Sequence, residues 1–306
     1  NYLTVFVMSD YLNLPNKRAT IPTTSMTDTV TFESQVDVFW ATTHLPKLLS
    51  HVFDVFKDNV TANLMFGSTG LSIFALYHCK TVCTITKLGR DIFSDFSCPK
   101  EVLASVNLMV LAKKINTLLK FKANDITFKN DSDDLVLTGR NSQNKCAEIK
   151  LRPLDVELEE LDVSNCFQYN VSFRVRSAEL ARYIECMPDS FEIYLDGSIG
   201  CLMFVGKEVY SVTKLPLMLD GCILSVINKY PDVKNYRASF TKHNLSFISK
   251  GVKLSDYAVV SISNDSPLCI QFVLLESSDL TETNQSTVTM YFSPQEPEDD
   301  DMPYDY

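Results

Sequence analysis

The side chains that most often perform catalysis or bind metal ions are few in this sequence and poorly spaced for either task. Among its four histidines, His44 and His51 lie seven residues apart in a segment with helical periodicity, whereas two histidines that bind one metal ion from a helix are usually four apart. Paired carboxylates such as Glu159 and Glu160 lie in an acidic stretch, where solvation explains them. The sequence contains no glycine-rich phosphate loop, no GxSxG motif and no HExxH motif. We therefore predict no catalytic residue, no metal site and no cofactor, and a protein that is not an enzyme.

The nine cysteines indicate free thiols rather than a disulfide framework. Their number is odd, no CxxC pair occurs, and the closest pair is Cys79 and Cys83. The apolar residues 2–8 lack a basic region and are too short for a secretory signal, and no apolar run reaches the roughly 20 residues of a membrane span. We expect buried thiols in a reducing compartment, in a protein that is not secreted and has no membrane partner.

Charge is distributed unevenly along the chain. The formal net charge is −10, with 38 acidic and 28 basic residues among 306, so a protein that binds DNA over its whole surface is excluded. The acids concentrate near residues 155–162, in the C-terminal stretch and in loops such as 131–134, whereas the four segments with helical periodicity carry mostly bases. Helices on one side of a sheet would gather these bases on a surface that a phosphate backbone could follow. Ordinary solvated helix faces would explain the same pattern.

Hydrophobic periodicity divides the chain into isolated helices and many short strands. Apolar residues recur at helical spacing in residues 43–58, 108–121, 176–187 and 241–252. The remaining apolar segments are short and often alternate with polar residues, as half-buried antiparallel strands do. Residues 105–137 and 237–270 repeat the order helix, strand, Asn-Asp-Ser turn and strand. We predict an α+β fold of two similar domains, each with two helices and antiparallel sheets.

The same patterns suggest domain boundaries. We expect a flexible N-terminal extension over residues 1–33, a first domain over 34–151 and a connecting loop over 152–168. A second domain follows over 169–294, and an acidic C-terminal tail over 295–306.

Five segments, in this order and spacing, resemble one family. They are GLSIFALYHCKTVCTITKL, SVNLMVLAKKINTLLK, EIKLRPLDVELEEL, YNVSFRVRSAELARYI and SNDSPLCIQF, the last followed by MYFSP and an acidic run. Over roughly residues 36–301 the chain resembles DNA sliding clamps of the proliferating cell nuclear antigen type, the processivity factors of DNA polymerases. The resemblance implies the DNA-clamp fold and a homotrimer, a pseudo-sixfold ring closed head to tail around duplex DNA, without sequence preference.

The resemblance also implies which bases face the DNA. Helices line the hole of such rings, and the acidic sheets form the rim. His243 and Glu185 stand where arginine is common in the family. The DNA-binding positions that match the family's bases are Lys47, Lys113, Arg182 and Lys250. We expect Lys120 and Lys253 to add to them from the same helices.

A second implied surface is a groove that binds a short aromatic docking motif of polymerases and other partners. Tyr77 and Lys80 replace an acid and a histidine common there, and the connecting loop is about two residues longer than in the family. The positions that would form the groove are Leu76, Lys80, Thr81, Cys83, Leu158, Leu161, Pro267, Tyr291, Ser293 and Pro294.

The leading hypothesis is therefore a DNA replication and repair clamp that tethers a polymerase, is placed on DNA by a clamp loader, and acts in the nucleus or a viral replication compartment. Two alternatives keep the fold. The chain could be one subunit of a heterotrimeric checkpoint-type clamp. It could also be a ring-free viral processivity factor, which should need a strongly basic face.

Overall fold

The computed structural model describes residues 39–56, 61–77, 80–131, 133–155, 167–196, 200–218, 223–226, 236–264, 266–275 and 285–295. The predicted extension over 1–33, most of the acidic tail, and Leu158 and Leu161 of the predicted groove lie outside these residues.

The described strands form three antiparallel sheets. The first has five strands in the order β5 (Asp95–Ser97), β1 (Trp40–Thr43), β7 (Ala123–Asp131), β8 (Asp134–Asn141) and β9 (Cys146–Leu151). The second has nine strands in the order β14 (Ile223–Val226), β10 (Val171–Arg176), β16 (Tyr257–Ile262), β17 (Leu268–Val273), β18 (Thr287–Phe292), β4 (Val82–Gly89), β3 (Gly70–Leu76), β2 (Thr61–Gly67) and β6 (Val102–Asn107). The third has four, in the order β13 (Val212–Met218), β12 (Cys201–Lys207), β11 (Ser190–Asp196) and β15 (Arg237–Thr241).

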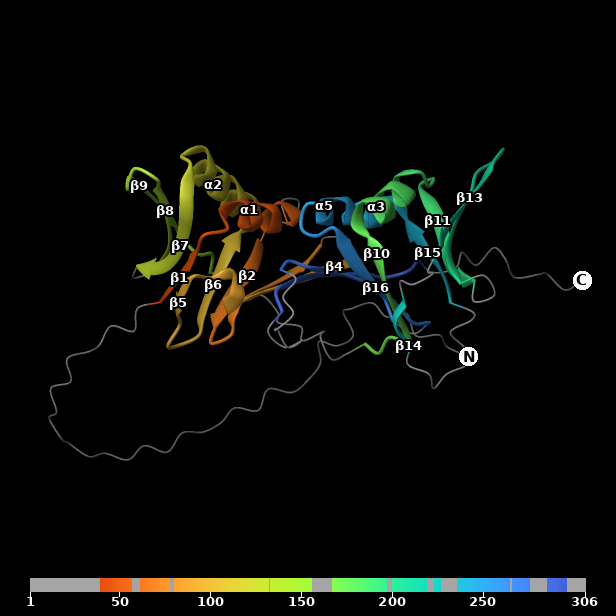
Figure 1. Ribbon diagram of the computed structural model, residues 1–306, viewed down its shortest axis with the longest axis horizontal. Helices are drawn as coiled ribbons and strands as arrows, with labels where there is room; N and C mark the ends of the chain where they lie inside the picture. Colours follow the sequence, from red (N-terminus) through yellow and green to blue (C-terminus); the bar gives the residue numbers. More distant parts are fainter. Residues whose placement is uncertain are drawn as a thin grey trace, which may run out of the picture.

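The helices lie along one side of the molecule, above the sheets, in the order α2, α1, α5 and α3 (Figure 1). Their bounds are α1 Pro46–Val55, α2 Leu108–Lys120, α3 Ser177–Glu185, α4 Lys242–Leu245 and α5 Ile248–Gly251, with a short 3-10 turn at Arg90–Ile92. Each of the three longer helices buries an apolar face and exposes a polar one. The predicted α+β clamp fold is confirmed.

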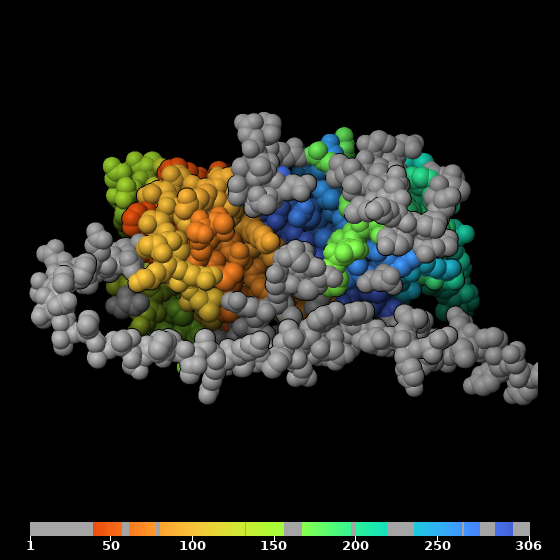
Figure 2. Space-filling view, turned by 90° about the horizontal axis from the view of Figure 1, so that it is seen from below, coloured from red at the N-terminus to blue at the C-terminus, as the bar shows by residue number. Residues whose placement is uncertain are grey.

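One sheet joins the two halves of the chain. β18, near the C-terminus, pairs along its whole length with β4 from the first half, with Thr287 opposite Lys87 and Phe292 opposite Val82. The nine-stranded sheet therefore runs without a break from β6 to β14. Seen from the side turned away from the helices, the orange and yellow surface of the early strands adjoins the blue and green surface of the later ones (Figure 2).

The first helix begins later than predicted. Trp40–Thr43 is a strand, β1, held between β5 and β7, and Thr43 is buried with its hydroxyl donating to the Ile92 carbonyl at 2.7 Å. The helix then begins at Pro46, because proline has no N–H to satisfy and its fixed φ suits the first helical position. The prediction that residues 43–45 are helical was wrong.

The fourth predicted helix, over 241–252, is two short helices. α4 ends at Leu245 and α5 begins at Ile248. At the break Phe247 is buried, with its ring centroid 4.4 Å from that of Tyr77. Gly251 closes α5 against the ring of Phe272, where a Cβ atom would collide with it.

Phenylalanine rings fill the core beneath the helices in both halves. Phe66 contacts Phe39 and Phe128, with ring centroids 4.4 and 5.7 Å apart. Phe204 contacts Phe191 and Tyr183 on the other side of the molecule. These contacts hold the sheets beneath the helices and so fix where the exposed helix faces point.

Candidate DNA-facing surface and partner groove

The six predicted DNA-binding residues all come from the helical side of the molecule. Lys47 lies on α1, Lys113 and Lys120 on α2, and Arg182 on α3, each with an exposed side chain. Lys250 on α5 is half-buried, with its Nζ 4.4 Å from the ring centroid of Phe247. Lys253, just beyond α5, is exposed.

The basic character of this side extends beyond the predicted residues. Lys114 is exposed on α2, next to Lys113. Lys242 at the start of α4 donates to the Glu185 carbonyl at 2.8 Å, which leaves its charge on the helical side. The acids on the same helices are Asp54, Glu179 and Glu185. Bases outnumber acids there, although the whole chain is acidic.

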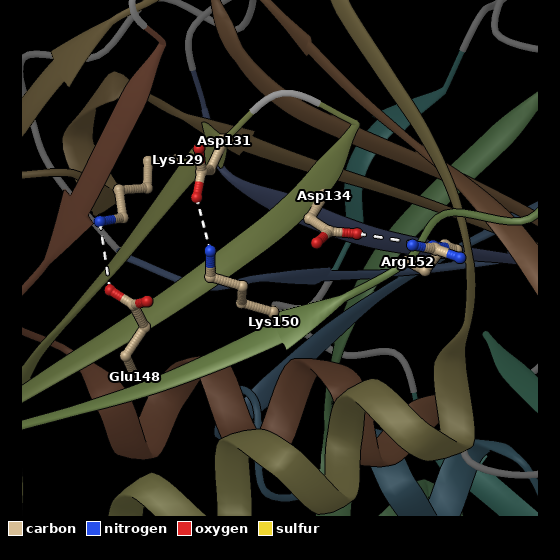
Figure 3. A network of polar contacts seen from close by, with 6 residues as sticks. All are labelled: Lys129, Asp131, Asp134, Glu148, Lys150 and Arg152. Carbon is tan, nitrogen blue, oxygen red and sulfur yellow. Dashed lines mark hydrogen bonds and ion pairs between the residues drawn. The ribbon is translucent and has the colours of Figure 1, made fainter.

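Three ion pairs occupy the outer face of the five-stranded sheet (Figure 3). They are Lys129–Glu148 at 3.3 Å, Lys150–Asp131 at 2.6 Å and Arg152–Asp134 at 3.9 Å. The Lys150 ammonium hydrogen-bonds to Asp131 and holds the pKa of that carboxyl below its usual value.

These pairs change the interpretation of one acidic loop. The sequence shows residues 131–134 as one of several acidic stretches, but in the structure Asp131 pairs with Lys150 of β9 and Asp134 with Arg152, the residue after β9. The difference in charge between the helical side and the outer face of the five-stranded sheet is therefore smaller than the amino-acid composition suggests.

Several predicted groove residues meet on the outer face of the nine-stranded sheet. Leu76 pairs with Cys83, Cys83 with Tyr291, and Tyr291 with Cys269, so these four side chains form a row on one face. Cys83, Cys269 and Tyr291 form a cluster separate from the main core, with Leu76 packed against it. Cys83 is fully covered and Pro267 is buried, while Ser293 is half-buried and Pro294 exposed.

Sequence reasoning missed four aromatic and aliphatic side chains in this cluster. Phe74 and Ile85 pack against it from β3 and β4, and Phe167 and Tyr169 pack against it from the segment before β10. The Phe167 and Tyr291 ring centroids are 5.7 Å apart. The alternation of β3 and β4 could have placed Phe74 beside Leu76 and Ile85 beside Cys83, since residues two apart share a face.

Burial makes the cluster's thiols poor nucleophiles. Desolvation raises the pKa of Cys83 and of Cys269 to about 12. Desolvation likewise raises the pKa of the neighbouring Tyr169 hydroxyl. Because the thiolate is the reactive form, this row of side chains offers an apolar surface and no nucleophile.

The turn before β4 is held by contacts with the core. Tyr77 is buried and donates its hydroxyl to the Val55 carbonyl at 3.0 Å, so it faces the core. Lys80 has a φ of 55°, in the left-handed region, and its N–H donates to the Tyr77 carbonyl at 2.7 Å.

Thr81, the next residue, connects the turn to two other parts of the chain. The Thr81 hydroxyl accepts from Asn244 Nδ2 at 2.9 Å. The Thr81 carbonyl accepts the Ser293 N–H at 2.8 Å, which ties the C-terminal segment to the turn.

The two described ends of the predicted connecting loop also lie against the nine-stranded sheet. Leu154 donates its N–H to the Ser105 carbonyl of β6 at 2.7 Å, and Phe167 contacts Tyr291 of β18. Leu158 and Leu161, which were expected to cover the groove, lie between these ends and outside the described residues.

Two comparisons bear on this arrangement. Residues 39–164 match the family model described as proliferating cell nuclear antigen, N-terminal domain. Proliferating cell nuclear antigen 1 of Plasmodium falciparum, from isolates K1 (Thailand) and 3D7, is 22% identical over 263 residues, which cover 83% of this chain and 94% of the relative. Both findings support the resemblance to the proliferating cell nuclear antigen family. The clamp fold and the resemblance of the sequence to this family are confirmed.

Within this clamp fold, no cluster of His, Cys, Asp and Glu that could hold a metal ion occurs among the described residues. In the same part of the chain, no helix is both long and apolar enough to cross a membrane.

Proposed function

We propose that this clamp encircles duplex DNA as a homotrimer and acts as a polymerase processivity factor, with clamp domains over residues 34–151 and 169–294. The observation that carries the proposal is the concentration of bases on the helical side of an acidic chain. Exposed ammonium and guanidinium groups attract phosphates without reading bases, which suits a ring that slides. The family resemblance supports a site of action in the nucleus or a viral replication compartment.

The ends of the molecule support head-to-tail assembly. β9 and β13 are outer strands of two different sheets and lie at opposite ends of the molecule (Figure 1). Two other edge strands already accept a backbone hydrogen bond from within the chain, because the Leu154 N–H donates to the Ser105 carbonyl of β6 and the Gln295 N–H donates to the Ser239 carbonyl of β15. Pairing β9 of one copy with β13 of the next would continue both sheets, keep the helices on one side, and repeat until a ring closes.

The outer face of the nine-stranded sheet suits partner binding in this proposal. The apolar row around Leu76 and Tyr291 would accept an aromatic side chain, and Lys80, Thr81, Ser293 and Pro294 would border it. Leu158 and Leu161 would cover the docked segment. Cys83 and Pro267 would lie beneath the groove and determine the shape of its floor.

The experiment that tests the proposal combines native mass with primer extension. Three chains of 34.6 kDa give about 104 kDa, so light scattering over a concentration series should find that species. On long primed templates the ring and its loader should lengthen the products of a single polymerase encounter. A monomer at every concentration would refute the homotrimer and favour a heterotrimer subunit or a ring-free factor. A 104 kDa species that leaves product length unchanged would refute the processivity role.

A further inference from the structure

The last described residue, Gln295, is anchored beside the candidate groove. Its N–H donates to the Ser239 carbonyl of β15 at 2.7 Å, and its side-chain Oε1 accepts from the Ser190 hydroxyl at 2.8 Å. Gln295 follows the groove residue Tyr291 by four positions, and four residues span at most about 14 Å. Whatever follows Gln295 in the sequence therefore starts from a fixed point next to the groove.

The sequence after this anchor has two parts of different character. Residues 296–301 contain five acids and one proline, and residues 302–306 read Met-Pro-Tyr-Asp-Tyr. Solvation explains the run of acids, because like charges at this density repel one another and stay in water. It does not explain Met302, Tyr304 and Tyr306. A methionine and two tyrosines within five residues are side chains that an apolar groove binds well.

The groove presents a surface of the right kind. Leu76 and Phe74 of β3 and Ile85 of β4 are half-buried and pack against the cluster that contains Tyr291 of β18. Their strands are neighbours in the order β18, β4, β3. Adjacent strands lie about 4.8 Å apart, so the three strands form a surface about 10 Å wide. A surface of this width can bind one or two aromatic rings.

The length of the segment allows it to turn back onto this surface. Seven residues lead from Gln295 to Met302, and they can extend to about 24 Å. That is more than the distance of at most about 14 Å that separates Gln295 from Tyr291. Proline and aspartate also favour the tight turns by which a chain reverses its direction.

Charge favours the same path. Lys80 is exposed at the border of the groove, and no ion pair between described residues includes it. The acids of residues 296–301 would pass close to this ammonium group on the way from Gln295 to the groove. Such an attraction between exposed groups is modest and is screened by salt. The apolar residues after the acids must therefore supply most of the binding.

We propose that residues 302–306 bind in the groove of their own chain and compete there with the docking motifs of partners. The inference rests on the proposed partner groove and adds a regulation to it. A short tether gives the segment a local concentration of about 3 mM at the groove. With a dissociation constant of about 1 mM it would fill the groove about three-quarters of the time, and the apparent affinity of a partner would fall about fourfold. Weak partners are then excluded, whereas strong ones displace the segment.

The first experiment compares the full chain with a variant that carries Met302→Ser, Tyr304→Ser and Tyr306→Ser. This variant keeps every acid of the segment. The probe is a fluorescein-labelled peptide with a glutamine, an aliphatic residue and two adjacent aromatic residues, and its binding is followed by anisotropy. We expect the variant to bind the probe about fourfold more tightly. A synthetic peptide of residues 296–306, added at millimolar concentration, should reverse this gain.

The matched control is Leu103→Ser. It removes an exposed apolar side chain from β6, at the far edge of the same sheet, and should leave the affinity for the probe unchanged. Equal affinity of the full chain and the triple variant would overturn the inference. Weaker binding by the triple variant would also overturn it, because the segment would then assist partners instead of competing with them.

A second experiment detects the contact without any partner. Tyr304 is replaced by the photo-cross-linking residue p-benzoylphenylalanine, and the adducts formed in the full chain are mapped by mass spectrometry. We expect adducts on β3, β4 or β18 of the same chain, and fewer of them when the probe peptide is in excess. Adducts found only on other elements, or only between two chains, would overturn the inference. If the probe binds neither form of the protein, the proposed partner groove fails, whereas adducts on these strands would still support the contact of the segment.

Discussion

Replacing Lys113 and Lys250 together by glutamine should weaken the attraction of the helical side for DNA without altering assembly. Lys113 is exposed on α2, and Lys250 holds its ammonium over Phe247 on α5. Glutamine removes each charge and keeps a polar side chain. Neither residue lies on β9 or β13, so the mass in solution should remain that of the wild type.

The magnitude follows from counterion release. Each phosphate neutralised on B-DNA contributes about 0.9 to the slope of log binding constant against log salt concentration. Two lysines in each of three copies give at most six such contacts, so the slope should fall by no more than about 5. A loosely fitting ring contacts only some phosphates at one time, and a decrease of about 2 is the expected result.

The assay is fluorescence anisotropy of a short linear duplex, titrated with the clamp at several salt concentrations. Linear DNA with free ends allows the ring to thread on and off, so the measurement reports equilibrium binding. The matched control replaces Lys87 and Lys145, which are exposed but lie on β4 and in the β8–β9 turn. An equal decrease in slope for the control, or no decrease for the helix variant, would refute the assignment of the helical side to DNA.

Three further predictions concern stability. Tyr77→Phe leaves the Val55 carbonyl without its 3.0 Å hydrogen bond and should lower the free energy of unfolding by about 1 kcal/mol in urea titrations; an unchanged midpoint would mean that water replaces the hydroxyl. The folded-state pKa of Cys83 and Cys269 is about 12 against 9.0 for the unfolded chain, so stability is fully present below pH 9 and should fall as pH rises toward 12. Cys83→Ala should flatten that fall, and parallel curves would contradict it. Lys150→Met breaks an exposed ion pair and should leave the melting temperature nearly unchanged; a large decrease would show that the network on that sheet acts cooperatively.

The elements of this fold were largely predictable because most are long enough to show a period. α2 was expected over residues 108–121 and extends over Leu108–Lys120, where the Asn107 side chain accepts from the Val110 N–H and caps it. β1 was missed because four residues are too few to show alternation. The break between α4 and α5 was missed because the local pattern continues through it, and only the distant Tyr77 ring explains why Phe247 turns inward.

The candidate groove was predictable only in part, for a different reason. Its row of side chains is created by the pairing of β4 with β18, two strands about 200 residues apart in the sequence, and local patterns carry no information about which strands become neighbours. The resemblance supplied Leu76, Cys83 and Tyr291, but it did not supply Phe74, Ile85, Phe167 and Tyr169, which pack around them.

Tyr77 illustrates how a departure from a family pattern can preserve a shape. An acid in that position would have to face water, whereas the tyrosine turns inward, bonds the end of α1 and packs on Phe247. The turn that follows is then held by core contacts on its inner side and by the hydrogen bonds of Thr81 to Asn244 and Ser293 on the other. The groove border is thus attached to α1, α4 and the C-terminal segment together. A substitution at Tyr77 therefore has to be judged by its effect on three elements, and not as the loss of one surface charge.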